Sequence, residues 1–151
     1  MELTDLISPE RIACDVEAKS KKRALETLSE LISSADSKFS SLEVFSSLLA
    51  RERLGGTGVG HGVAIPHGRL KNSANKTIGA LIKLKYGVDF DTLDNKPVDL
   101  LFALLVPENS TDEHLQVLAV LASLFEQEDF RAKLREADSP EKVYQLIKEW
   151  Q

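Results

Sequence analysis

The stretch from Val98 to Val106 constrains the fold most, because it is almost continuously apolar and ends directly before Pro107. A short apolar run bounded by a proline is typical of a strand buried on both faces, whereas a half-exposed strand alternates apolar and polar residues. A strand of this kind needs other elements packed against both sides of its sheet. We therefore expect this segment to be the central strand of the fold.

Helices and strands alternate along the rest of the chain. Thr77–Lys85 alternates apolar and other residues, which predicts a half-buried strand followed by a turn at Tyr86-Gly87. Apolar residues at three-and-four spacing predict helices over 20–33, 40–51, 129–137 and 140–150, and a further helix after a cap at Thr111 or Asp112. We therefore expect an α/β fold, with a small mixed β-sheet flanked by helices on both faces, as a single domain over residues 1–151.

The composition excludes several classes of protein. Hydrophobic residues make up 42% and charged residues 28% of the chain, which is typical of a globular domain. A net charge of -5 argues against a nucleic-acid partner, because such binding needs clustered Lys and Arg. Cys14 is the only cysteine, so an internal disulfide and a thiolate zinc site are excluded. The N-terminus lacks a signal pattern and no apolar run is long enough for a bilayer, which favours a cytoplasmic protein without membrane insertion.

Residues 55–68 differ in character from the rest, with six glycines, one proline and two histidines. Such a composition predicts a loop with unusual backbone angles and close approach of other groups. Within it, Pro66 restricts the backbone before His67, and Gly68 removes side-chain bulk beside the imidazole. These features suit an oriented nucleophile, although a turn histidine bonded to the backbone is an equally consistent interpretation.

A neutral imidazole held through its N–H presents a lone pair for attack on phosphorus. Arg51 and Arg69 could then neutralise the phosphoryl oxygens. His114 falls in the first turn of its predicted helix, where backbone N–H groups favour an anion, so it could donate to a phosphoryl group or simply be an exposed helix-start residue. His61, between two glycines, could merely tolerate a turn conformation.

Motifs for other chemistries are absent. The glycines do not satisfy G-x-G-x-x-G, and no G-x-x-x-x-G-K-[S/T], H-E-x-x-H or G-x-S-x-G occurs. The three histidines also lack the short pairing expected of zinc ligands. We therefore expect neither a metal nor a cofactor. The basic residues of 19–23 are expected to form a solvated helix start or a docking patch.

The run Arg-Glu-Arg-Leu-Gly-Gly-Thr-Gly-Val-Gly-His-Gly-Val-Ala-Ile-Pro-His-Gly over residues 51–68 closely resembles the active-site loop of enzyme IIA domains of the bacterial phosphotransferase system, in their mannitol/fructose/nitrogen class. Residues 20–26 and 94–107 resemble the nitrogen-regulatory branch in particular. The resemblance covers nearly the whole chain and implies a mixed sheet flanked by helices, in agreement with the pattern of predicted elements.

The same resemblance implies roles for individual residues. His67 matches the phosphorylated histidine of the family, and His114 matches a second histidine that lies beside it. Arg51 and Thr57 match residues associated with the same pocket, and Gly68, Arg69 and His61 are further candidates for binding the phosphoryl group or a partner. His61 departs from the family pattern, in which asparagine or another residue is common.

The implied activity is phosphotransfer between protein histidines. A phosphocarrier of the nitrogen-related system accepts the phosphoryl group from an HPr-like phosphohistidine protein, binds no nucleotide, and regulates partner proteins by its phosphorylation state. The alternative within the family is a IIA component of fructose/mannitol-type sugar uptake, which passes the group to a IIB component. A third possibility is an interaction domain without phosphotransfer, which retention of both His67 and His114 disfavours.

Overall fold

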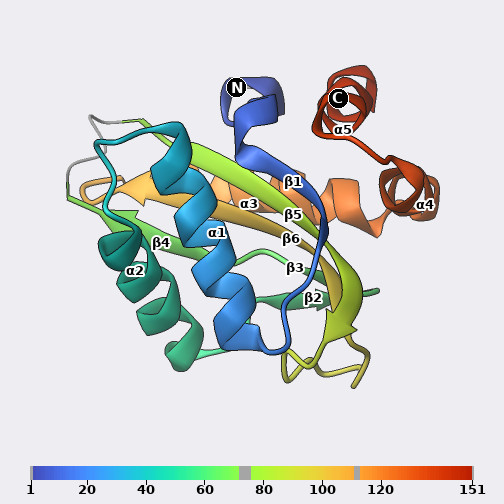
Figure 1. Cartoon of the computed structure of the whole chain (residues 1–151), viewed down its shortest axis with the longest axis horizontal. Coiled ribbons are helices and arrows are strands. Elements are labelled where there is room, and N and C mark those ends of the chain that lie inside the picture. Colours follow the sequence, from blue (N-terminus) through green and yellow to red (C-terminus); the bar gives the residue numbers. More distant parts are fainter. Residues whose placement is uncertain (1, 72–75, 111–112, 151) are drawn as a thin grey trace.

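The sheet of the computed structural model is built around β6 (Val98–Pro107), as Figure 1 shows. The structure describes residues 2–71, 76–110 and 113–150, without the side chains of residues 113 and 114. β6 is antiparallel to β5 (Ile78–Val88) and parallel to both β3 (Val63–Ala64) and β4 (His67–Leu70). β1 (Ile12–Val16) runs parallel to β5, and β2 (Gly58–Gly60) runs antiparallel to β3. The predicted mixed sheet is thus confirmed.

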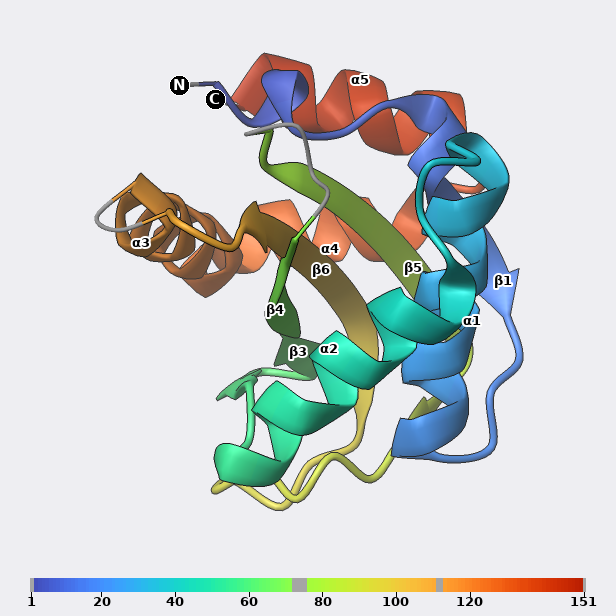
Figure 2. The same ribbon diagram turned by 90° about the vertical axis from the view of Figure 1, so that its left-hand side faces the viewer.

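Helices cover both faces of this sheet (Figure 2). One face is covered by α1 (Lys21–Ala35) and α2 (Ser41–Leu54), and the other by α3 (Glu113–Glu126), α4 (Glu128–Glu136) and α5 (Pro140–Trp150). The predicted caps at Ser20, Ser40 and Ser139 are confirmed, because each hydroxyl accepts a backbone N–H three residues later. The prediction for Thr111 or Asp112 lies outside the described residues. The expected single α/β domain with helices on both faces is confirmed.

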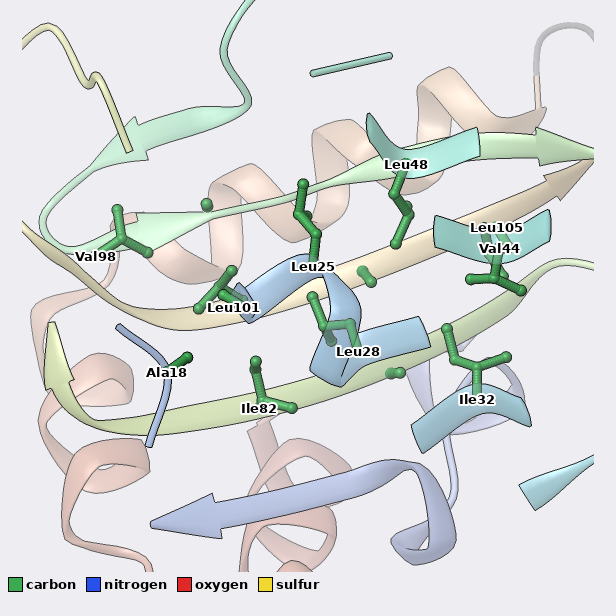
Figure 3. Close-up of a cluster of buried hydrophobic side chains, with 14 of the residues drawn as sticks. Ala18, Leu25, Leu28, Ile32, Val44, Leu48, Ile82, Val98, Leu101 and Leu105 are labelled. Atoms are coloured by element: carbon green, nitrogen blue, oxygen red, sulfur yellow. The ribbon is translucent and has the colours of Figure 1, made fainter. Parts of the chain in front are cut away.

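β6 is the central strand that the apolar run predicts. From Leu100 to Val106 each residue is at most 1% exposed. Leu101, Ala103 and Leu105 belong to a cluster beneath α1 and α2, which Figure 3 shows between the helices and the sheet. The alternate residues, including Phe102, pack against the N-terminal segment and α3–α5. Two separate apolar layers therefore hold the sheet in place, each through burial of the aliphatic side chains that face it.

Two predictions for the strand beginning near residue 78 are wrong. β5 does not turn at Tyr86-Gly87 but continues to Val88. Nor is it half-buried, because residues 78–84 are buried on both faces. The second face is covered by the C-terminal helices, and the ammonium of Lys83 donates to the backbone carbonyls of Arg135 and Ala137 at the end of α4. The alternation in the sequence thus reflects a lysine whose charge is satisfied inside the fold.

The sequence pattern gives no expectation for β1, a short edge strand that lacks clear alternation. Two short 3₁₀ helices, Leu3–Asp5 and Pro9–Arg11, precede it. Residues 55–68, expected as a loop, contain β2, β3 and the beginning of β4. Among the described residues, no helix has the length and apolar character needed to cross a membrane.

Candidate functional site

His67 is the first residue of β4. It follows a short break between β3 and β4, two strands that both pair with β6. β3 pairs with Leu100 and Leu101, and β4 resumes the pairing at Leu104. Between them Pro66 has no N–H to donate, but its carbonyl still accepts the N–H of Leu104 at 2.8 Å. His67 pairs with Leu104, whose side chain belongs to the layer beneath α3, and so His67 points to the face that α3 covers.

The imidazole of His67 is half-buried and its two nitrogens meet different groups. Nδ1 lies 3.0 Å from the carbonyl oxygen of Ile65, which can only accept a hydrogen bond. Nε2 accepts the Nε–H of Arg51 at 3.2 Å, and an arginine can only donate. These two contacts are satisfied together by the tautomer that carries its proton on Nδ1. The lone pair is therefore on Nε2, beside a guanidinium.

Arg51 lies near the C-terminal end of α2 and is held in place by its own contact. Its Nη1 donates to the carbonyl of Gly55 at 2.7 Å, directly after the helix ends. A guanidinium presents five N–H groups in a planar fork, which allows one side to stay fixed while another faces an anion. The structure thus brings Arg51 and His67 together, as the sequence resemblance implies.

Thr57 is buried and contacts the site through the backbone rather than through its hydroxyl. Its carbonyl accepts the N–H of Ile65 at 2.9 Å. Its own N–H and hydroxyl donate to the two carboxylate oxygens of Glu52, at 3.1 Å and 2.5 Å. Thr57 therefore supports the peptide that contacts His67.

Glu52 lies within the motif over residues 51–68, but the resemblance implies no role for it. It is 5% exposed. It follows Val44 and Leu48 at four-residue spacing, so it falls on the apolar stripe of α2. A charged residue on such a stripe needs buried partners, and this signal was present in the sequence.

Gly68 and Arg69 make contacts away from the imidazole, and their part in binding a phosphoryl group or a partner stays a prediction. Consecutive strand residues point to opposite faces, so Gly68 faces α2 and not the imidazole. A side chain at Gly68 would contact Ser47 Oγ and approach the backbone carbon and oxygen of Ser47 to 3.1 Å each. Arg69 donates from Nη1 to the carbonyls of Glu108 and Ser110, at 3.0 and 2.5 Å. Gly68 admits α2, and Arg69 binds the turn that precedes α3.

His61 lies in a tight turn between β2 and β3. Its φ is 58° and that of Gly62 is 78°, the pair of positive values that a two-residue hairpin turn requires. Asn-Gly is the preferred sequence for such a turn, and histidine, like asparagine, adopts positive φ more often than most residues do. The exposed His61 lines a cavity of about 440 Å³ together with Lys96, Arg131 and Arg135, and the residues around His67 do not line it. The structure does not bring His61 to His67.

The prediction for His114 concerns a side chain outside the described part of the structure. Its position in the chain is in the first turn of α3, and α3 covers the face to which His67 points. Within the described residues, no group of three or more His, Cys, Asp or Glu side chains is arranged to hold a metal ion. The absence of a metal or cofactor from the reaction stays a prediction.

Known proteins match this chain over nearly its full length. The family described as "Phosphoenolpyruvate-dependent sugar phosphotransferase system, EIIA 2" matches residues 5–150. A nitrogen regulatory protein of Pseudomonas aeruginosa is 43% identical over 145 residues, which cover 96% of this chain and 94% of that protein. A fructose-specific EIIA component of Haloferax volcanii is 36% identical over 152 residues, which cover 99% and 98% of the two chains.

A solved structure shares the fold as well as the sequence. The crystal structure of the nitrogen regulatory protein IIA-Ntr from Neisseria meningitidis superposes with a TM-score of 0.88 at 42% identity, covering 96% of this chain and 98% of that one. The chain therefore belongs to the EIIA type 2 family of the phosphotransferase system, whose members transfer phosphoryl groups through a histidine.

Proposed function

We propose that this chain is a cytoplasmic phosphocarrier of the nitrogen-related phosphotransferase system, which accepts a phosphoryl group on Nε2 of His67 from an HPr-like phosphohistidine protein. The observation that carries the proposal is the pair of contacts on the imidazole. Ile65 holds Nδ1–H, and this leaves the lone pair on Nε2 beside the positive charge of Arg51. A nucleophile and a group that compensates negative charge thus meet in one place.

The proposed transfer is a direct exchange between two imidazoles. The lone pair of His67 Nε2 attacks phosphorus, the nitrogen–phosphorus bond of the donor breaks, and the donor imidazole leaves with that electron pair. The proton on Nδ1 of His67 stays in place and keeps its contact with the Ile65 carbonyl. The protein contributes position and charge compensation, which is the usual contribution in phosphoryl transfer. Arg51 supplies the charge, and His114 is the proposed second donor to the phosphoryl oxygens.

The phosphorylated state is proposed to regulate partner proteins. A phosphoryl group adds roughly two negative charges to the surface beside His67, enough to break one interface or to favour a basic one. The names and identities of the nitrogen regulatory relatives support this branch of the family. The alternative is a IIA component of sugar uptake that passes the group to a IIB component, which the fructose-specific relative at 36% identity favours.

Incubation with a purified, phosphorylated HPr-like donor tests the proposal. Intact mass should increase by one phosphoryl group, the modification should be labile to acid, and peptide mapping should place it on His67. His67→Ala should take up no label, whereas His61→Ala is the matched control and should be labelled normally. Chelator should not affect transfer. An acid-labile phosphate on His67→Ala would assign the acceptor to another residue, and transfer onward to a fructose-type IIB protein would favour the sugar-uptake alternative.

A further inference from the structure

An ion pair between the partly exposed Lys21 and the buried Glu52 joins the N-terminal end of α1 to the C-terminal end of α2. Lys21 Nζ lies 2.9 Å from Glu52 Oε1, and the two side chains are 22% and 2% exposed. The same ammonium lies 5.0 Å from the centroid of the buried Phe90 ring and 3.8 Å from Asp91. The sequence predicts a solvated helix start or a docking patch for residues 19–23. Lys21 instead contacts a buried carboxylate and a buried ring. It compensates a carboxylate that has been removed from water.

The carboxylate of Glu52 connects to His67 through two residues, Thr57 and Ile65. Both of its oxygens accept hydrogen bonds from Thr57, whose carbonyl in turn accepts the N–H of Ile65. The carbonyl of Ile65 then contacts Nδ1 of His67 at 3.0 Å. Since Pro66 follows directly, the backbone at Ile65 has restricted conformations and transmits a displacement of Thr57 to that carbonyl. The position of the group that selects the imidazole tautomer thus depends on Glu52.

We propose that Glu52, held by Lys21, is a positioning residue that keeps His67 in the Nδ1–H tautomer and so presents the Nε2 lone pair to the phosphoryl donor. It acts through Thr57 and Ile65 rather than on the reacting atoms. This inference deepens the proposed function and rests on it.

Glu52→Gln is the direct test, because it keeps the size of the side chain but replaces one acceptor oxygen with an NH₂ group, which can only donate. Long-range ¹H–¹⁵N NMR of the unphosphorylated protein reports which ring nitrogen of His67 carries the proton. The Nε2–H tautomer should gain population in the variant. Transfer from the phosphorylated donor should slow about tenfold, as expected for the loss of one charge-assisted hydrogen bond. Glu26→Gln, which breaks only the exposed pair of Glu26 and Arg23 at 2.8 Å, is the matched control and should leave both unchanged.

A pair of variants at Thr57 separates positioning from a general loss of structure. Thr57→Val keeps the shape but loses the hydroxyl bond to Glu52, whereas Thr57→Ser keeps that bond. The valine variant should shift the tautomer and slow transfer about threefold to tenfold, and the serine variant should behave as wild type. This comparison tests the positioning role of Glu52 even if Glu52→Gln does not fold. Equal behaviour of the two Thr57 variants would overturn the proposal, as would a wild-type tautomer in a folded Glu52→Gln.

The tautomer of His67 is measured in the unphosphorylated protein. The proposed function and the positioning role of Glu52 can therefore be refuted independently. Wild-type protein that takes no label on His67 would refute the proposed function. Normal labelling of His67 with an unchanged tautomer in Glu52→Gln would refute the positioning role alone.

Discussion

Gly68→Ala tests whether the close packing of α2 on β4 sets the geometry of the site. The new Cβ would meet Ser47 Oγ and lie 3.1 Å from the backbone carbon and oxygen of Ser47. The hydroxyl can rotate away, but it would then lose its hydrogen bond to the Arg69 carbonyl at 2.8 Å. The backbone atoms can move only if α2 moves. Because Arg51 lies one turn after Ser47, such a movement would also draw the guanidinium away from His67.

The expected magnitude follows from two opposing effects. Forcing a methyl group into a packed contact costs about 1–3 kcal/mol, and replacing glycine by alanine recovers about 0.4–1 kcal/mol by restricting the unfolded chain. The net loss should be about 1–2 kcal/mol in the free energy of unfolding. For a domain of this size that corresponds to a decrease of about 2–8 °C in Tm.

Chemical denaturation, thermal unfolding and the rate of phosphoryl transfer would be measured for Gly68→Ala and for Gly55→Ala. Gly55 is the matched control, because a Cβ there meets nothing within 4 Å. Adding Ser47→Ala should relieve part of the cost, with a coupling energy of about 1 kcal/mol between the two substitutions. If Gly68→Ala is no less stable than Gly55→Ala and transfers at the wild-type rate, the contact between α2 and β4 does not control the site.

Four further outcomes are expected. Arg51→Met should shift the transfer equilibrium about 10- to 100-fold toward the donor, whereas Arg53→Met, an exposed side chain in the same helix turn, should not. His114→Ala should still be labelled on His67 but transfer about 10- to 100-fold more slowly, and unchanged kinetics would reduce His114 to a helix-start residue. His61→Asn should change the free energy of unfolding by less than about 0.5 kcal/mol, whereas His61→Val should lower it by about 1–2 kcal/mol, because φ is positive at this position. Both values would be measured by chemical denaturation, and equal losses would contradict the assigned turn. Burial raises the pKa of the Cys14 thiol, so alkylation at neutral pH should be slower than that of a free thiol and should accelerate in denaturant.

The fold was predictable wherever one local signal decided the outcome. The apolar run before Pro107 identified the central strand, and serines before apolar stripes identified the starts of α1, α2 and α5. The predictions fail where the burial or pairing of a strand depends on segments far away in the sequence. β5 is buried on its second face because α4 and α5 return to cover it, and no pattern within residues 77–88 contains that information. β1 is likewise defined by pairing with a strand far along the chain, and not by its own alternation.

The sequence indicates which residues gather near His67, but not the contacts that hold each of them in place. The motif brought Arg51, Thr57 and His67 to attention, and the structure places Arg51 against the imidazole. The sequence also makes Gly68 and Arg69 candidates for binding the phosphoryl group or a partner, and that role stays a prediction. The alternation of a strand separates Gly68 from its neighbours by turning it to the other face, and Arg69 is engaged by carbonyls of a turn that only the fold brings near. Spacing alone cannot supply either fact.

The two contacts on the imidazole have different fates under the proposed mechanism. The bond from Arg51 Nε to Nε2 must be given up when a phosphoryl group occupies that nitrogen, but the guanidinium keeps its bond to the Gly55 carbonyl and can turn a remaining N–H toward a phosphoryl oxygen. The contact of Nδ1 with Ile65 involves no reacting atom, so we expect it to persist in both states. The support from Lys21, Glu52 and Thr57 is therefore the same before and after transfer. A partner that distinguishes the two states must then recognise the added charge beside His67 and not a rearranged backbone.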